Sequence, residues 1–331
     1  MTARPRGDLR YWLAAQRGPL IAAALFAAMF ALFVTEHPAG LSANVVNTAA
    51  NKGVLLAFVA IAQTLPVLTS GLDLSVGSVF VLANCVASTL VTGSPLEIAL
   101  GVAAVLGCGL VCGALNGLVV VVGRLQPIIA TLATGAIYGG VALWLRPTPG
   151  GAIDEDFADF VTGSAGGVVP VSLLVLIAAI VLVWIPYRRS VAGRAAYAIG
   201  SSEQAAYMSG VPVARSKFLA YMLAGLFAAI AGLLLTCVTY SGEANALLGG
   251  SYTLSSVAAV VVGGTSLYGG AGGAIGTIFG AFVLRTIGDL LFVFDIDALA
   301  QPLFLGVVLL VSVSLGSLRL LKVKKRLDLY R

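Results

Sequence analysis

Charged residues are scarce in this chain, and their scarcity narrows its class. They make up 10% of the 331 residues, whereas hydrophobic residues make up 59%. A soluble domain carries about 25% charged residues, so this composition excludes an ordinary soluble protein. The length allows many apolar spans of about 20 residues each, and the 40 glycines suit helices that pack closely in a membrane. The composition predicts an all-α polytopic membrane protein that moves a polar solute.

The sequence also lacks the residues that most enzymes need. It has one histidine, His37, and no Gly-Lys dipeptide, so it has no phosphate-binding loop of the GxxxxGK[ST] type. The four cysteines lie in apolar runs, and the pair Cys108 and Cys112 has no polar partner nearby in sequence, so we interpret them as packing residues. We therefore expect no catalysis, no metal and no cofactor in this chain. Uphill transport would draw its energy from a separate ATPase or from coupling ions.

Ten apolar segments are candidates to span the membrane. Basic residues cluster before the first segment, after the sixth and after the last, and an even number of spans separates these clusters. The positive-inside rule then makes residues 1–19, 188–217 and 319–331 cytoplasmic, although Lys52 and Arg146 fit this pattern less well. The segments are about 20–35, 45–69, 74–92, 97–122, 126–145, 170–187, 216–240, 252–268, 272–293 and 299–318.

Two connecting segments stand out. Residues 147–169 are rich in Gly, Asp and Pro and are expected to form a loop on the outer face. On the cytoplasmic side, Ser201 or Ser202 can cap a short helix that carries Glu203 in its first turn and ends at Gly210. A helix this short is unstable alone in water, so we predict that it docks on a partner rather than serving as a simple connector.

A polar interruption, SGLDLSVGS at residues 70–78, separates two apolar runs. A carboxylate such as Asp73 is costly at membrane depth unless it faces a cavity or a partner, and non-helical backbone survives there only when it is buried in protein or lines a cavity. The alternative is an ordinary tight turn at the cytoplasmic surface, with Asp73 as a helix cap. Ser75 and Ser78 are further capping candidates. The residues alone do not decide between a functional site and a turn.

A second interruption, GGTSLYGGAGG at residues 263–273, also follows an apolar run. A helix with closely spaced small residues follows each interruption, at 113–117 and at 276–280. This recurrence makes two pseudo-repeated halves plausible. Asn116 is the one polar residue within the small-residue segment 113–117. We expect it either to bond a neighbouring helix or to reach the pathway. Arg285 and Asp289 stand four residues apart and are expected to pair with each other rather than to relay protons.

Several motifs together resemble the permease subunits of ribose-type bacterial ABC importers. Residues 69–78, TSGLDLSVGS, are similar to the TGGIDLSVGS signature of that family. Further similar blocks follow in family order at 113–119, 127–132, 193–200, 203–206, 209–213 and 261–267, so the resemblance covers about residues 45–318. Gly139 and Tyr207 stand where the family usually has arginine, and Ser201 and Ser202 replace a Gly-Asn-like pair.

The resemblance implies one transmembrane permease domain over residues 1–331, with a type II importer fold, in the bacterial inner membrane. It implies a second permease subunit, two cytoplasmic ATP-binding subunits and a periplasmic sugar-binding protein as partners. The solute would be a monosaccharide or related small polyol moved by alternating access; the alternative is an ion-coupled secondary transporter or channel for a small polar solute. Expected pathway residues are Asp73, Ser75, Asn116, Thr131, Thr265 and Ser266; expected ATPase-coupling residues are Arg194, Glu203, Gln204, Ala205 and Ser209.

Overall fold

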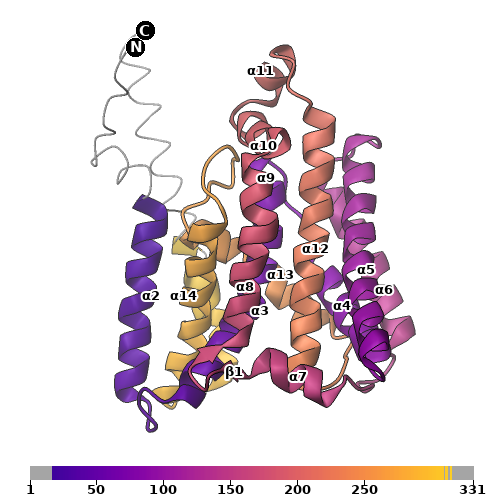
Figure 1. Cartoon of the computed structure of the whole chain (residues 1–331). Helices are drawn as coiled ribbons and strands as arrows, with labels where there is room; N and C mark the ends of the chain where they lie inside the picture. The colour runs from indigo at the N-terminus through magenta and orange to yellow at the C-terminus, as the bar shows by residue number, and fades with distance from the viewer. Residues whose placement is uncertain (1–16, 309, 312–313, 315–331) are drawn as a thin grey trace, which may run out of the picture.

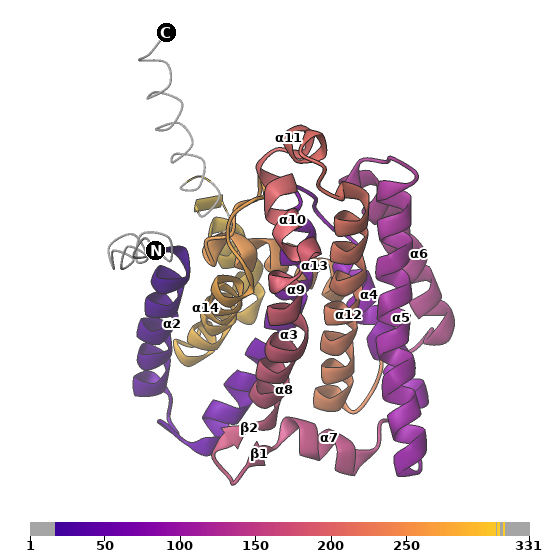
Figure 2. The same ribbon diagram turned by 45° about the horizontal axis from the view of Figure 1, so that its top comes forward.

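The computed structural model describes residues 17–308, 310, 311 and 314, and within them the chain is almost entirely helical. The long helices run roughly along one axis, with α11 at one end of the bundle and α7 at the other (Figure 1, Figure 2). The elements in chain order are α2 (Arg17–Glu36), α3 (Ala43–Leu68), α4 (Val76–Leu90), α5 (Pro95–Val121), α6 (Pro127–Leu145), α7 (Glu155–Thr162), β1 (Ser164–Ala165), β2 (Val169–Pro170), α8 (Val171–Ala179), the π-helix η1 (Ile180–Trp184), α9 (Ile185–Arg189), α10 (Val191–Ser201), α11 (Glu203–Met208), α12 (Val213–Thr239), α13 (Ala246–Val262), α14 (Ala274–Val293) and the short 3-10 helix η2 (Ala298–Ala300).

Seven described stretches of helix are long and apolar enough to cross a membrane: α2, α3, α5, α6, α8 through α9, α12 and α14. Helices α4 and α13 are also apolar, but they have only 15 and 17 residues. The expectation of a multi-pass helical membrane protein is thus confirmed, whereas the count of ten spans is not. Of the tenth candidate, residues 299–318, the structure describes 299–308, 310, 311 and 314, and residues 301–308 are helical.

One span differs clearly from its predicted limits. The eighth was expected at 252–268, but α13 starts at Ala246 and ends at Val262. It starts earlier because Asn245 caps it, with its side-chain oxygen 3.0 Å from the amide nitrogen of Leu248. Residues 263–273 then form a loop in which five glycines have positive φ, a conformation that stops the helix.

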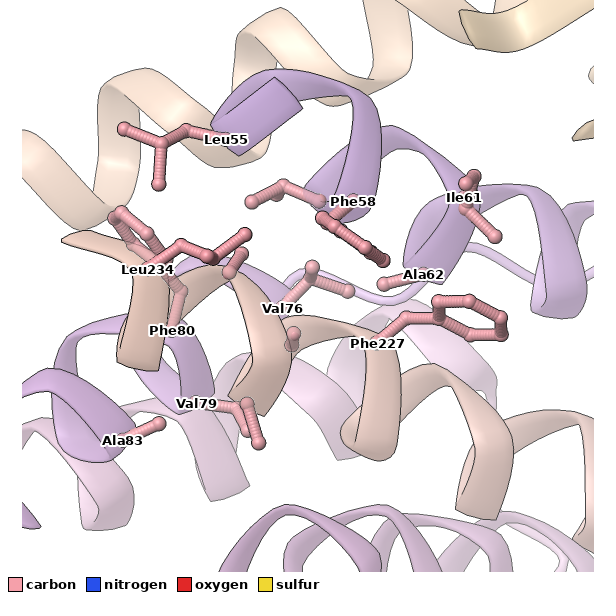
Figure 3. Close-up of a cluster of buried hydrophobic side chains, with 14 of the residues drawn as sticks. Leu55, Phe58, Ile61, Ala62, Val76, Val79, Phe80, Ala83, Phe227 and Leu234 are labelled. Atoms are coloured by element: carbon pink, nitrogen blue, oxygen red, sulfur yellow. The ribbon is translucent and has the colours of Figure 1, made fainter. Parts of the chain in front are cut away.

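The centre of the bundle is α3, whose residues 53–68 are all buried. A helix that is apolar on every side belongs in an interior, and α3 is surrounded by α4, α12, α13 and α14. Phe58 of α3 stacks on Phe227 of α12 with ring centroids 6.2 Å apart, and Val76 and Phe80 of α4 pack in the same cluster (Figure 3). The helix that leads into the first polar interruption is therefore the most deeply held part of the molecule.

The expected outer loop contains a short amphipathic helix, α7, and the β1–β2 hairpin. Asp154 caps α7 by accepting a 2.9 Å hydrogen bond from the amide of Phe157. Asn47 and Asn51 of α3 both donate to the carbonyl oxygen of Thr162, at 2.8 and 2.7 Å. These bonds fix α7 across the end of the bundle opposite to α11 (Figure 1).

The short helices α4 and α13 touch through glycine. A Cβ atom on Gly77 would lie 1.9 Å from the carbonyl oxygen of Gly249, a separation that no side chain tolerates. The amide of Gly77 also donates to the hydroxyl of Thr253 at 3.1 Å. Glycine is thus required at residue 77 because two helix backbones meet there.

We predict that Gly77→Ala lowers the stability of the protein by about 1–3 kcal/mol, the usual cost of overpacking. The measurement is thermal unfolding of the purified protein in detergent. The matched control is Gly140→Ala on α6, where an added Cβ has no atom within 4 Å and alanine favours the helix by up to about 1 kcal/mol. Equal melting temperatures for the two variants would contradict the close approach of α4 to α13.

Candidate functional site

The first polar interruption, residues 69–75, is non-helical and lies inside the protein. It follows the end of α3, where the amides of Thr69 and Gly71 both bond the carbonyl oxygen of Pro66, at 2.9 and 3.0 Å. Thr69, Asp73 and Ser75 are each at most 2% exposed. Backbone that leaves a helix in such a place needs hydrogen bonds from the surrounding protein, and the neighbouring helices supply them.

Asp73 organises this segment. Its Oδ1 accepts hydrogen bonds from the amide of Ser75 at 2.9 Å and from the hydroxyl of Ser75 at 2.6 Å. The side-chain amide of Asn116, on α5, donates to the Ser75 hydroxyl at 2.7 Å and lies 3.4 Å from Asp73 Oδ2. Ser75 occupies the capping position of α4, but its own side chain does not cap the helix. Asp73 thus forms a local turn, as one interpretation expected, but the turn is buried in a polar network rather than at the surface, and Ser75 rather than Asp73 holds the capping position.

Two further helices, α3 and α6, hold the same segment. With its amide oriented so that both ends are satisfied, Gln63 of α3 donates to the Asp73 carbonyl at 2.8 Å and accepts from the Asp73 amide at 3.2 Å. Thr131 of α6 accepts from the amide of Leu74 at 2.9 Å. Tyr138, also on α6, places its hydroxyl 3.0 Å from Asn116 Oδ1. We call these residues, Gln63, Asp73, Ser75, Asn116, Thr131 and Tyr138, the Asp73 network.

The second interruption, residues 263–273, has a network of its own. Thr265 accepts a 3.0 Å hydrogen bond from the amide of Gly273, and its hydroxyl lies 3.4 Å from that of Thr277 on α14. The Thr277 hydroxyl lies 3.0 Å from the hydroxyl of Thr64 on α3. Ser266 stabilises a local turn by accepting from the amide of Tyr268 at 3.2 Å. Neighbouring residues of α3, Gln63 and Thr64, therefore serve one interruption each.

The two interruptions touch each other and the end of α10. Ser70 donates toward the carbonyl oxygens of Tyr268, at 2.7 Å, and Gly200, at 3.2 Å. The amide of Gly270 donates to the carbonyl of Leu68 at 3.2 Å. A Cβ on Gly200 would lie 2.1 Å from the Leu68 oxygen and 2.2 Å from the Gly270 nitrogen. Only glycine at residue 200 lets the three backbones meet, and we call this contact the Gly200 junction.

Tyr197 strengthens that contact one turn earlier on α10. Its hydroxyl donates to the carbonyl oxygen of Gly272 at 2.9 Å. Burial raises the pKa of Tyr197 above its usual value, so this hydroxyl stays a donor over an even wider pH range than an exposed tyrosine. Helix α10 is thus bonded to the glycine-rich loop by a side chain as well as by the backbone.

The expected short helix is present as α11, and its limits are confirmed. Ser202 caps it by accepting a 3.3 Å hydrogen bond from the amide of Ala205, and Gly210 ends it with φ of 76°. Ala206 is its one buried residue and packs with residues of α10. Tyr207 and Met208 are 71% and 80% exposed, so α11 presents an unpartnered apolar face at the end of the bundle.

The expected coupling residues lie at this end and are all exposed: Arg194, Glu203, Gln204, Ala205 and Ser209. Glu203 pairs with Lys217 of α12 at 2.6 Å. Arg194 donates to the carbonyl of Arg189 at 2.5 Å. Beside them is a groove of about 690 Å3, which Arg124, Arg215 and Lys217 line together with Glu203.

The structure gathers four of the six expected pathway residues, Asp73, Ser75, Asn116 and Thr131, into one network, and it places Thr265 and Ser266 outside that network. All except Ser266 are at most 3% exposed, and the five bond within the protein. Tyr138 and Gly200 were not singled out from the sequence. The signal for Tyr138 was that it continues the line of hydroxyl residues Thr131 and Thr134 on an otherwise apolar helix. The signal for Gly200 was a glycine inside a helix pattern, which costs about 1 kcal/mol unless packing requires it.

We predict that Asn116→Leu destabilises the protein by about 1–3 kcal/mol, because the Ser75 hydroxyl, Asp73 Oδ2 and the Tyr138 hydroxyl lose a buried partner. Thermal unfolding in detergent measures the effect. Leu118→Ala, at a 46% exposed position of the same helix, is the control and should change the melting temperature little. An Asn116→Leu protein as stable as the control would show that the network does not hold the segment.

Comparison with known proteins places this arrangement in a family. Residues 45–313 match the family model described as "Branched-chain amino acid transport system / permease component". The chain is 38% identical over 263 residues to the ribose import permease protein of Bacillus subtilis (strain 168), covering 78% of this chain and 80% of that protein. It is 29% identical over 289 residues to an autoinducer 2 import system permease protein of Photorhabdus temperata, covering 85% and 86%.

A ribose import permease protein of Escherichia coli (strain K12) is 35% identical over 264 residues, covering 78% of this chain and 80% of that protein. No solved structure matches the chain. The family match spans both polar interruptions, α10 and α11. The prediction from the motifs is thereby confirmed, and the chain belongs to this family of transport-system permease components.

Proposed function

We propose that this chain is the membrane-spanning subunit of an ABC importer that carries a monosaccharide or related small polyol from the periplasm to the cytoplasm. The printed names of its relatives, import permeases for ribose and for autoinducer 2, support this solute class. Two copies of the permease, or this chain and a related one, would assemble with two ATP-binding subunits and a periplasmic sugar-binding protein. Residues 1–331 would form one permease domain in the inner membrane.

The end of the bundle that carries α11 is the cytoplasmic end in this proposal. The basic cluster at 188–217 supports this orientation by the positive-inside rule, and the outer face then carries α7. The chain segments 1–19 and 319–331 would both be cytoplasmic, since they flank spans that begin or end on that side; most of both segments lies outside the described residues.

The observation that carries the proposal is the line of contact from α11 to the two interruptions. Helix α11 packs on α10 through Ala206, and α10 ends at the Gly200 junction. A displacement of α11 would therefore reach residues 69–75 and 263–273 through α10 and the backbone contacts at Gly200. ATP binding and hydrolysis in a docked ATPase would act through this route, and close-packed contacts transmit small displacements well.

The groove beside α11 favours an acidic docking partner. Three of its lining residues are basic, Arg124, Arg215 and Lys217, and one, Glu203, is acidic. Acidic side chains of an ATPase subunit would be attracted to this end of the bundle. Arg194, Glu203, Gln204, Ala205 and Ser209 are the proposed coupling residues.

The solute path would involve the two interruptions in a changed conformation. In the present one Asp73, Ser75, Asn116, Thr131 and Thr265 bond inside the chain and are nearly inaccessible, so they and Ser266 would meet a solute only after these contacts rearrange. The succession α3, residues 69–75 and α4 would be matched by α13, residues 263–273 and α14 as repeated units. Helix–break–helix units of this kind occur in pairs in transporters.

Uptake of labelled ribose into proteoliposomes tests the function. The full complex, with the binding protein outside and ATP inside, should accumulate the sugar, whereas vesicles with this chain alone should not. The rival, an ion-coupled carrier or channel, predicts the reverse: uptake by the purified chain alone when a proton or sodium gradient is applied. That result would overturn the proposal.

We predict that Met208→Asp reduces transport and the retention of the ATPase subunit at least tenfold, because docking would bury an unpaired carboxylate, which is costly at an interface. The melting temperature should not fall, because residue 208 is 80% exposed in this chain. Co-purification of the ATPase in detergent measures the loss. Val191→Asp is the control: residue 191 is 63% exposed, on α10 at the same end. Equal losses in both variants would show that α11 is not the specific docking element.

A further inference from the structure

An apolar groove of about 420 Å3 lies between α2, α3, α8 and α14. Phenylalanines form one wall, and the ring of Phe26 on α2 lies 5.2 Å from that of Phe282 and 6.4 Å from that of Phe279 on α14, centroid to centroid. Ile177 and Ile275 on its rim are 55% and 51% exposed. All four helices belong to stretches that are long and apolar enough to cross a membrane, so in a bilayer the groove as described would face the hydrocarbon phase.

Charged side chains stand at one end of the groove. Arg285 and Asp289 of α14 are four residues apart and pair as expected, with Arg285 Nη2 3.8 Å from Asp289 Oδ1. Lys52 of α3, the basic residue that fitted the positive-inside pattern poorly, lies 3.8 Å from the same oxygen. Two cations thus share one carboxylate, and the cluster carries a net charge of +1.

The cations are incompletely satisfied by that carboxylate. Both nitrogen–oxygen distances, 3.8 Å, exceed the range of a hydrogen bond. Arg285 Nε is buried and has no hydrogen-bond partner among the described residues. The Lys52 side chain is 43% exposed, so it can reach an oxygen atom outside the protein. An additional anion would fill donors that Asp289 leaves open.

The cluster lies toward the end of α14 that follows Asp289, within reach of a lipid headgroup. Asp289 is four residues and Arg285 eight residues before the end of α14 at Val293, which places them about 6 and 12 Å along the axis from that end at 1.5 Å per residue. The exposed Asp295 follows. Long basic side chains at this depth extend toward the membrane surface. The charges therefore lie where the phosphate of a phospholipid would lie if its acyl chain occupied the apolar groove.

We propose that this groove, bounded by Lys52 and Arg285, binds one anionic phospholipid of the leaflet on the α7 side. The acyl chain would lie along the phenylalanine wall, and the headgroup phosphate would accept hydrogen bonds from the two cations. A zwitterionic lipid fits the apolar part equally well, but its ammonium group adds a repulsive charge near the cluster. The site is separate from the two interruptions and from α11, and it does not depend on the proposed solute.

Native mass spectrometry of the delipidated full chain in detergent tests the proposal, with palmitoyl-oleoyl phosphatidylglycerol and phosphatidylcholine as the two probes. The wild type should bind the first more tightly. Lys52→Gln should weaken phosphatidylglycerol binding about fivefold, the effect of one basic residue near a lipid surface, and should leave phosphatidylcholine unchanged. Asp289→Asn, which keeps the shape and removes the competing carboxylate, should strengthen phosphatidylglycerol binding.

Two further variants separate this groove from general lipid attraction. Ala49→Phe, on the lining of the groove, should weaken binding of both lipids. Arg189→Gln removes an exposed cation at the opposite end of the bundle and should change neither. Equal affinity of the wild type for the two lipids, no lipid bound at all, or changes of the same sign in Lys52→Gln and Asp289→Asn would overturn the proposal. The opposite signs expected for these two variants exclude simple misfolding as the cause.

Discussion

The rest of the structure depends on one constraint: backbone that leaves a helix inside a membrane protein must find hydrogen-bond partners there. Residues 69–75 meet this constraint through the carboxylate of Asp73, which accepts from the amide of Ser75, and through Gln63 and Thr131 of adjacent helices, which bond the backbone of Asp73 and Leu74. Asn116 of α5 in turn bonds the side chains of Ser75 and Asp73. Unsatisfied polar groups cost several kcal/mol each in such surroundings. The polar residues of α3, α5 and α6 are therefore needed because α3 ends where it does.

The same constraint explains why the two interruptions lie together. Each one exposes carbonyl and amide groups, and those of Leu68 and Gly270 bond each other directly. Gly200 completes the contact because its missing side chain lets α10 approach both segments. A site that is satisfied mainly by backbone atoms changes as a unit, since moving one segment leaves the others with unpaired groups. This is the physical reason to propose that a movement of α10 and α11 is passed on to both segments in an import permease.

Composition and charge placement predicted the helical membrane class, because burial in lipid imposes a strong and simple pattern on sequence. The limits of α11 were predictable as well, since Ser202 and Gly210 act locally. The joining of Asp73 to Asn116 was not, because residues 43 positions apart come together only through the crossing of α5 with the interruption. The early start of α13 was missed for a different reason: Asn245 signals a helix start only if the chain before it is known to turn. Likewise the pairing of Lys52 with Asp289 connects helices distant in sequence.

Burial finally limits how the polar networks can serve transport. A side chain that is 0–3% exposed and bonded within its own chain cannot contact a solute unless those bonds break first. Leaving one buried polar group without its hydrogen bond costs about 1–3 kcal/mol, and the Asp73 network contains several such bonds, so opening it costs several times that amount. A conformation in which these side chains meet a solute must therefore offset the loss of several hydrogen bonds. In the proposed import complex the ATPase would supply this energy, and it would act on the exposed face of α11 and, behind it, on the Gly200 junction.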